Sequence, residues 1–139
     1  MKRFVVTPSR CTACRTCELA CSFRHGEGQT LGATRIRAFL FGEGKNVPLT
    51  CLQCEAAACV SVCPVAAVKR NDRTGAVEVL EGRCIGCRAC VAACPFGAMA
   101  FLEEERVAYK CDLCGGAPAC AQFCPTKALA YGEPPRRGA

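Results

Sequence analysis

The sequence predicts a small α+β protein in which two interleaved modules, built from short hairpins and short helices, assemble around cysteine side chains. The chain has 139 residues and 16 cysteines, and the cysteines fall into four groups of four with nearly the same spacing. Three groups are followed by proline and then by a short apolar segment, a unit that recurs along the chain. Turn signals lie between these segments, so only short hairpins fit between successive groups.

The third cysteine group carries the clearest chemical signal. It has the order C-x2-C-x2-C-x3-C-P and consists of Cys84, Cys87, Cys90 and Cys94. Bacterial ferredoxins hold iron–sulfur clusters with this run, and its fourth cysteine binds a neighbouring cluster. Pro95 disfavours helix at Cys94, so the helical turn between Cys90 and Cys94 ends there. We expect Gly86 to keep backbone bulk away from the cluster.

The other three groups repeat this pattern with small changes in spacing. The first, C-x2-C-x2-C-x3-C, contains Cys11, Cys14, Cys17 and Cys21. The second, C-x2-C-x4-C-x3-C-P, contains Cys51, Cys54, Cys59 and Cys63. The fourth, C-x2-C-x5-C-x3-C-P, contains Cys111, Cys114, Cys120 and Cys124. These groups use all 16 cysteines, which predicts four [4Fe–4S] clusters with the sixteen thiolates as iron ligands.

Disulfides and structural zinc are the other common uses of many cysteines. Disulfide frameworks are typical of small secreted chains. Here the chain starts with Met-Lys-Arg and a short apolar triplet at residues 4–6, too brief for a secretory signal, so we expect a cytoplasmic protein. Zinc ribbons use paired C-x2-C knuckles separated by longer loops, without the C-x3-C-P ending. Both uses are therefore disfavoured.

The composition indicates that metal supplies part of the stability. Cysteine accounts for much of the 51% hydrophobic fraction, Trp is absent, and only seven Phe and two Tyr are present. Chains this poor in large core side chains usually rely on disulfides or metals. We therefore expect cluster assembly to be coupled to folding, and the apo-protein to be largely disordered.

The formal charge of +6 counts the thiols as neutral. Four oxidised clusters with their thiolates add about −8 and bring the balance to about −2. The basic composition therefore gives little support for nucleic-acid binding. No stretch approaches the roughly 18 apolar residues needed to cross a membrane.

Short strands and turns are predicted between the cysteine groups. Strands are expected at residues 2–7, 35–41, 65–68, 76–80, 99–102, 107–109 and 126–131, with a lead-in at residues 47–50. Turns are expected at residues 42–45, 71–75 and 103–105, and a polar stretch at residues 22–32. This pattern predicts an inner two-cluster module at residues 51–101 and an outer one at residues 1–50 and 102–131. Residues 132–139 form a tail.

The four groups together make the chain resemble the four-cluster electron-transfer subunits of molybdopterin or tungstopterin oxidoreductases and of some hydrogenases and carbon monoxide dehydrogenases. The resemblance covers residues 10–131. It is strongest to the small ferredoxin-like subunits that accompany aldehyde:ferredoxin oxidoreductase-type tungsten enzymes. Residues 17–23 (CELACSF), His25, Gly26 and residues 51–55 (CLQCE) carry it. Larger membrane-linked relatives have long insertions that this chain lacks. The resemblance implies two interleaved bacterial-ferredoxin-like modules.

The resemblance also implies which cysteines share a cluster. The implied sets are Cys51, Cys54, Cys59 with Cys94; Cys84, Cys87, Cys90 with Cys63; Cys111, Cys114, Cys120 with Cys21; and Cys11, Cys14, Cys17 with Cys124. A sequential pairing of the first group with the second is the alternative, and it requires residues 22–50 to replace a single hairpin.

A cluster with four cysteine ligands has no open iron site, so its chemistry is one-electron transfer. No nucleophile, acid–base pair or phosphate loop is recognisable, and the chain is not expected to be an enzyme by itself. We predict an electron-transfer subunit between a catalytic subunit, of the tungsten- or molybdenum-pterin aldehyde oxidoreductase type, and a second partner such as ferredoxin or a flavoprotein. The alternatives are a free-standing polyferredoxin, a subunit of a hydrogenase or carbon monoxide dehydrogenase, and a scaffold without redox turnover.

Several polar residues near the groups have two interpretations. His25 is the only histidine and is a candidate proton relay or ligand, but no group lacks a ligand, which favours a turn cap or a partner contact. Five basic residues adjoin ligands and neutralise cluster charge or tune its potential: Arg10, Arg15, Arg83, Arg88 and Lys110. The acidic residues 103–105 form a solvated turn or an acidic docking patch.

Overall fold

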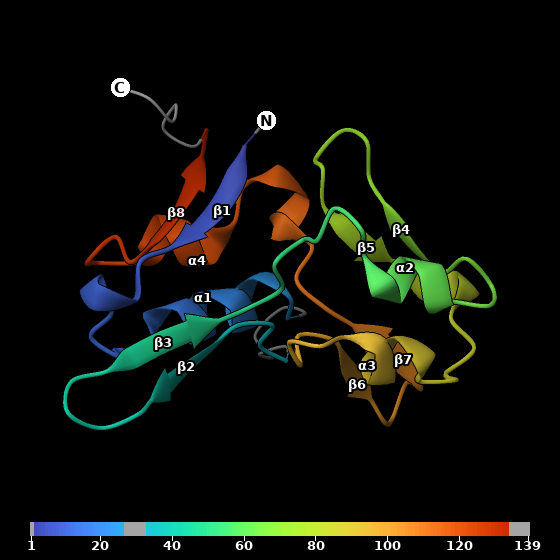
Figure 1. Ribbon diagram of the computed structural model, residues 1–139, viewed down its shortest axis with the longest axis horizontal. Coiled ribbons are helices and arrows are strands. Elements are labelled where there is room, and N and C mark those ends of the chain that lie inside the picture. The colour runs from blue at the N-terminus through green and yellow to red at the C-terminus, as the bar shows by residue number, and fades with distance from the viewer. Residues whose placement is uncertain (1, 27–32, 134–139) are drawn as a thin grey trace. The chain divides into compact units, whose positions relative to one another are not determined.

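The computed structural model describes residues 2–26 and 33–133. Its helices and strands are short and confirm the predicted α+β class (Figure 1). In chain order the strands are β1 (Arg3–Val6), β2 (Arg37–Leu40), β3 (Asn46–Leu49), β4 (Val68–Arg70), β5 (Val77–Val79), β6 (Ala100–Leu102), β7 (Val107–Tyr109) and β8 (Leu129–Gly132). The α-helices are α1 (Thr16–Arg24), α2 (Ala58–Val62), α3 (Ala89–Ala93) and α4 (Ala119–Phe123). Short 3-10 segments lie at Pro8–Arg10, Glu81–Arg83 and Leu113–Gly116.

The chain divides into two compact units. One consists of Thr50–Gly116, and the other of Met1–Leu49 with Ala117–Ala139. Within the described residues, none of the helices has the length and apolar character that a membrane crossing requires.

The Thr50–Gly116 unit contains two hairpins and two helices. β4 pairs antiparallel with β5, with Val68 opposite Val79, and β6 pairs antiparallel with β7. α2 and α3 pack on each other. The buried core of this unit includes Val77, Met99 and Cys90, the last of which lies on α3. A strand was predicted to begin at residue 65, but β4 begins at Val68. The chain first turns back around the Cys63 sulfur, with Ala66 at a φ of 52°, before it becomes extended.

The other unit joins the two ends of the described chain. β1 pairs antiparallel with β8, with Phe4 opposite Tyr131, while α1 packs on α4. β2 and β3 form a separate antiparallel hairpin, in which the first strand and the turn were predicted, whereas only a lead-in was expected where β3 lies. Ile36 and Leu129 are the largest of its fully buried side chains. The predicted tail begins at Gly132, which is the last residue of β8, and residues 134–139 lie outside the described part.

Helix α1 is longer than the sequence predicted. A polar stretch was expected from Ser22 onward, but the helix continues to Arg24, and residues 27–32 of that stretch lie outside the described residues. The reason is the residue that follows the fourth cysteine. Proline follows Cys63, Cys94 and Cys124, whose backbones are extended with ψ values of 116°, 114° and 112°, and each preceding helix has five residues. Ser22 follows Cys21 and does not impose this stop.

The compact units and the predicted modules differ at one place. Residues 102–116 were assigned to the outer module, whereas they belong to the Thr50–Gly116 unit. β7 pairs with β6, and Lys110 donates hydrogen bonds to the carbonyls of Val77 and Cys111, so this segment is tied to the inner hairpins. The assignment of clusters to an inner and an outer module stays a prediction.

The structure gives a further reason for glycine at position 86, beside the expected approach to a cluster. Its φ is +73°, and a Cβ atom at this position would lie 2.8 Å from the carbonyl oxygen of Arg106. The close neighbour is therefore protein backbone from the β6–β7 hairpin.

We expect Gly86→Ala to lower the free energy of unfolding of the iron-loaded protein by roughly 2–4 kcal/mol, through left-handed strain and the displaced Arg106 carbonyl. Thermal unfolding followed by circular dichroism measures this. Gly82→Ala is the matched control, because nothing lies within 4 Å of its Cβ position. Equal losses in both variants would contradict the explanation.

Candidate functional site

The four C-x2-C loops share one backbone conformation. In each loop the residue before the second cysteine has a positive φ: Ala13 at 57°, Gln53 at 50°, Gly86 at 73° and Leu113 at 56°. Three of the four are not glycine, and for such residues this conformation is uncommon and costs about 1–2 kcal/mol. Its repetition in every group shows that the cysteine spacing sets a common loop shape, in which backbone N–H groups can face an anionic site.

The three Cys-Pro turns share a second conformation. Three residues after the cysteine, Ala66, Gly97 and Lys127 have φ values of 52°, 64° and 58°. The turn directs backbone N–H groups at the sulfur, as shown by the Ala67 N–H, which lies 3.2 Å from the Cys63 sulfur.

These N–H groups change the acidity of the three thiols. Burial by itself raises the pKa of Cys63, but hydrogen bonds from the backbone of residues 65–68 together lower it below the usual value. At Cys94, backbone hydrogen bonds likewise outweigh the effect of burial and lower the pKa. At Cys124, backbone hydrogen bonds and a hydrogen bond from the Thr126 hydroxyl together do the same. The turn therefore favours the thiolate, which is the form that binds metal.

The third cysteine of each of the first three groups lies on or beside a short helix and behaves in the opposite way. Burial raises the pKa of Cys17 to about 11, and it also raises the pKa values of Cys59 and Cys90. At Cys59 the nearby Lys110 partly opposes this effect. These thiols are protonated at neutral pH without metal, so metal binding must release their protons.

Three cavities bring cysteines from different groups together. The first is lined by Cys51, Cys54, Cys59 and Cys94. The second is lined by Cys63, Cys84, Cys87 and Cys90. The third is lined by Cys11, Cys14, Cys17 and Cys124. In each, three cysteines of one group meet the fourth cysteine of another, as the resemblance implies. The remaining lining is mostly apolar, and such thiolate donor sets suit iron–sulfur clusters.

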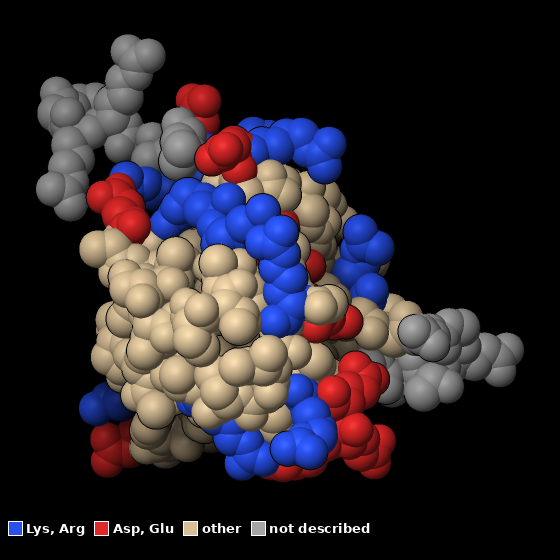
Figure 2. All heavy atoms as spheres, turned by 90° about the vertical axis from the view of Figure 1, so that its right-hand side faces the viewer, with Lys and Arg blue, Asp and Glu red and all other residues tan. Residues whose placement is uncertain are grey.

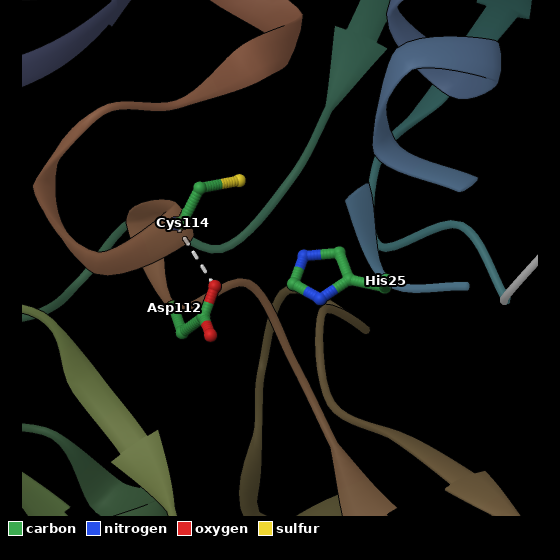
Figure 3. Close-up of side chains that lie close together, drawn as sticks. All are labelled: His25, Asp112 and Cys114. Carbon is green, nitrogen blue, oxygen red and sulfur yellow. Dashed lines mark hydrogen bonds between the residues drawn. The ribbon is translucent and has the colours of Figure 1, made fainter. Parts of the chain in front are cut away.

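Of the remaining four cysteines, two belong to each compact unit. Cys21 on α1 and Cys120 on α4 are buried in the same core cluster. In the Thr50–Gly116 unit, burial raises the pKa of Cys111, and the Asp112 carboxylate accepts a hydrogen bond of 2.9 Å from the Cys114 N–H (Figure 3).

His25 follows α1, where its N–H donates to the Cys21 carbonyl at 3.1 Å. This backbone contact agrees with the interpretation of His25 as part of the helix end.

The basic residues beside the ligands differ in their surroundings. Arg88 contacts the Glu103 carboxylate at 2.5 Å, and its guanidinium lies 4.3 Å from the centre of the Phe101 ring. Arg15 lies 3.9 Å from Glu18. The Arg88–Glu103 pair is solvent-exposed, a setting in which an ion pair contributes roughly 0–1 kcal/mol, whereas the Glu18 side chain is only 23% exposed and also accepts a hydrogen bond from the Ala38 N–H. Lys110 is instead buried.

Sequence reasoning missed two residues that hold the second cysteine loop. The Arg70 guanidinium donates to the carbonyls of Cys54 and Gly75. The Gln53 side chain accepts from the Val77 N–H and donates to the Cys111 carbonyl, each at 2.8 Å. The only sequence signal for Gln53 is its place inside a C-x2-C loop.

Large apolar side chains are exposed on the Thr50–Gly116 unit. They are Leu52, Val62, Val65, Ile85 and Phe96. Figure 2 shows a face on which uncharged surface forms one broad area bordered by Lys, Arg, Asp and Glu side chains.

Comparison with known proteins identifies the class to which this chain belongs. Residues 43–134 match the family described as the 4Fe-4S dicluster domain, and residues 8–24 match a 4Fe-4S binding domain. The chain belongs to the 4Fe-4S dicluster domain family. Its cofactors are four [4Fe–4S] clusters, as the sixteen cysteines predicted.

Several relatives are named as electron transport proteins or polyferredoxin-like subunits. The chain is 44% identical over 112 residues to an aliphatic sulfonate oxidoreductase, polyferredoxin-like subunit, of Pyrococcus furiosus, covering 81% of this chain and 65% of that protein. It is 42% identical over 124 residues to the putative electron transport protein YsaA of Escherichia coli K12, covering 82% and 77%. The electron transport protein HydN of the same organism is 38% identical over 136 residues, with the same coverage. Two of these relatives are named as electron transport proteins and the other as a polyferredoxin-like subunit, in agreement with the expectation that this chain is not an enzyme by itself.

Solved structures support the fold. The BamBC active site complex of benzoyl coenzyme A reductase, as isolated, contains a chain that matches with a TM-score of 0.55 at 24% identity, covering 99% of this chain and 82% of that one. The same complex with benzoyl-CoA matches with a TM-score of 0.54 at 24% identity, covering 94% and 78%. At this identity the likeness shows the fold alone.

Proposed function

We propose that this chain is the electron-transfer subunit of an oxidoreductase complex, and that it carries electrons along its four clusters between a catalytic subunit and a second redox partner. The observation that carries the proposal is the interleaving of the cysteine groups. Each of the three cavities is closed by a cysteine from a different group, so neighbouring cluster sites share one folded chain segment. Such sharing keeps clusters close together, which suits a row of carriers.

We propose the following ligand sets. They are Cys51, Cys54, Cys59 and Cys94; Cys63, Cys84, Cys87 and Cys90; Cys11, Cys14, Cys17 and Cys124; and Cys21, Cys111, Cys114 and Cys120. The cavities support the first three sets. The fourth follows from the cysteines that remain and from the resemblance.

The clusters supply one-electron chemistry when bound, and the chain controls its conditions. Four thiolates complete the coordination of each cluster, which leaves no iron open to substrate. The Cys-Pro turns direct N–H groups at the sulfur of Cys63, Cys94 and Cys124, and such hydrogen bonds stabilise added negative charge. The apolar lining of the cavities limits the access of water.

The proposed catalytic partner is a tungsten- or molybdenum-pterin subunit of the aldehyde oxidoreductase type. The support is the sequence of residues 17–23 and 51–55, and the Pyrococcus relative named for an aliphatic sulfonate oxidoreductase. Ferredoxin or a flavoprotein is the proposed second partner, and the cytoplasm the proposed location. A hydrogenase or carbon monoxide dehydrogenase is the alternative complex.

A free-standing polyferredoxin is the alternative that needs no permanent partner. The exposed apolar side chains favour a subunit, because Leu52 and Ile85 are 60% and 61% exposed and large exposed apolar patches mark interaction sites. A freely diffusing carrier gains nothing from such a surface.

Anaerobic purification of the tagged chain from its native cells tests the proposal. We expect a larger subunit to co-purify in stoichiometric amount, with tungsten or molybdenum detected by elemental analysis. Nickel in the complex would favour a hydrogenase or carbon monoxide dehydrogenase. A monomer that retains its iron and sulfide but no partner, and that exchanges electrons with several enzymes, would instead support the free carrier.

A further inference from the structure

Lys110, which follows β7, is a buried cation inside the Thr50–Gly116 unit. Its residue exposure is 3%, and it is the only charged side chain classed as buried within residues 2–26 and 33–133. Lysine is almost never fully buried unless its charge is paired. The position therefore requires a specific compensating group.

Hydrogen bonds hold the Lys110 side chain in place. Its Nζ donates to the Cys111 carbonyl at 2.6 Å, to the Gln53 Oε1 at 3.2 Å and to the Val77 carbonyl. These three acceptors fix the position of the nitrogen atom within the unit.

Gln53 holds the acceptors in place. Its Oε1 also accepts from the Val77 N–H at 2.8 Å, and its Nε2 donates to the Cys111 carbonyl at 2.8 Å. One side chain thereby links the second cysteine loop, strand β5 and the segment after β7. The ammonium group is fixed at the point where these three segments meet.

The same lysine lines the first cavity, together with Cys51, Cys54, Cys59 and Cys94. A cluster held by four thiolates carries a charge of about −2 when oxidised, and a buried cation needs opposite charge nearby. A cluster held at this site would add such charge beside Lys110. Lys110 is thus placed to interact with this cluster through a medium that screens charge weakly.

The second cavity of the unit has a cation of another kind. Arg88 lines it, but the Arg88 side chain is 53% exposed and contacts the Glu103 carboxylate. Solvent and the carboxylate screen its charge. The two cluster sites of the unit therefore differ in the cation that faces them.

We propose that Lys110 is a positioning residue that raises the reduction potential of the cluster at Cys51, Cys54, Cys59 and Cys94 above that of the cluster at Cys63, Cys84, Cys87 and Cys90. This inference rests on the proposed ligand sets. Reduction adds one negative charge, and a fixed buried ammonium stabilises the reduced form more than the oxidised form. Within this unit the electron therefore rests on the first of the two clusters.

Potentiometric titration of the complete iron-loaded chain, followed by electron paramagnetic resonance, tests the proposal. We expect Lys110→Gln to make the reduction of the cluster at Cys51, Cys54, Cys59 and Cys94 less favourable by roughly tenfold, about 59 mV for a one-electron couple. The cluster that includes the neighbouring Cys111 should shift in the same direction, because Lys110 also acts on that thiol, and the cluster at Cys63, Cys84, Cys87 and Cys90 should keep its potential. Lys110→Arg should retain the potential, because it keeps the charge. Lys69→Gln is the matched control, since Lys69 lies exposed on β4 of the same unit, and no step should move.

Iron and sulfide analysis separates the possible failures. Full cluster content with unchanged potentials in Lys110→Gln would overturn the role of Lys110 and leave the proposed function intact. A shift of the same size in Lys110→Arg would show that geometry and not charge is responsible, and would also overturn it. If the unaltered chain lacks four clusters, the proposed ligand sets fail first.

Lys110→Gln removes donors from buried carbonyl groups and can impair assembly. In that case Gln53→Glu provides the second test, because it keeps Lys110 and places a carboxylate beside its ammonium group. The same step should become less favourable. Unchanged potentials in fully loaded Gln53→Glu would overturn the inference.

Discussion

Removing iron from the chain with a chelator under anaerobic, reducing conditions unfolds it. This is the expected result because little other than metal stabilises the fold of either unit. Every described sheet has two strands of three or four residues, and isolated two-stranded hairpins are at best marginally stable in water. The largest fully buried side chains are Ile36, Leu129 and Val77, and much of the remaining core consists of alanine and cysteine.

Metal binding therefore supplies free energy of folding, as it does in other small metal-dependent domains. Far-UV circular dichroism and the visible absorbance of the clusters should be lost together, and the apo-protein should show no cooperative thermal transition. Adding iron and sulfide anaerobically should restore both signals. The matched control is the same chain incubated with iron-saturated chelator, which should keep its fold. An apo-protein that melts cooperatively would show that the apolar core suffices.

The cysteine spacing indicated where the C-x2-C loops lie, because cluster chemistry restricts that spacing, and the role of these cysteines as ligands stays a prediction. The short helix ending at each Cys-Pro, and the hairpin at residues 68–79, follow from local rules on proline and turns. The same rules explain why α1 runs on past Cys21, although the prediction of a polar stretch from Ser22 did not use them. Proline was absent there, and the helix had no stop.

Features that depend on distant contacts were beyond the sequence. The pairing of β1 with β8 joins residues more than one hundred positions apart, and each strand alone is only a four-residue apolar segment. The sequence did not show that Gly86 also lies against the Arg106 carbonyl. Lys110 was recognised only as a charge beside a ligand, because its burial depends on Gln53 and Val77 from other segments.

Double alanine variants of the cysteines give the largest separable effect on cluster content. The complete chain should bind about 16 iron atoms, four in each cluster. Removing one ligand should cost about one cluster. If two cysteines bind the same cluster, removing both loses no more iron than removing either one, because the effects of residues that act together are not additive. If they serve different clusters, two clusters are lost.

Cys63 distinguishes the proposed interleaving from ligation within one group. It lies in the same cavity as Cys84, while Cys51 of its own group lines another cavity. We therefore expect Cys63→Ala with Cys84→Ala to retain about 12 iron atoms, and Cys63→Ala with Cys51→Ala to retain about 8. Iron and acid-labile sulfide measured on the same anaerobic sample check both numbers. If the first variant retained about 8 iron atoms and the second about 12, each group would hold its own cluster. The proposal that neighbouring clusters share a chain segment would then be wrong.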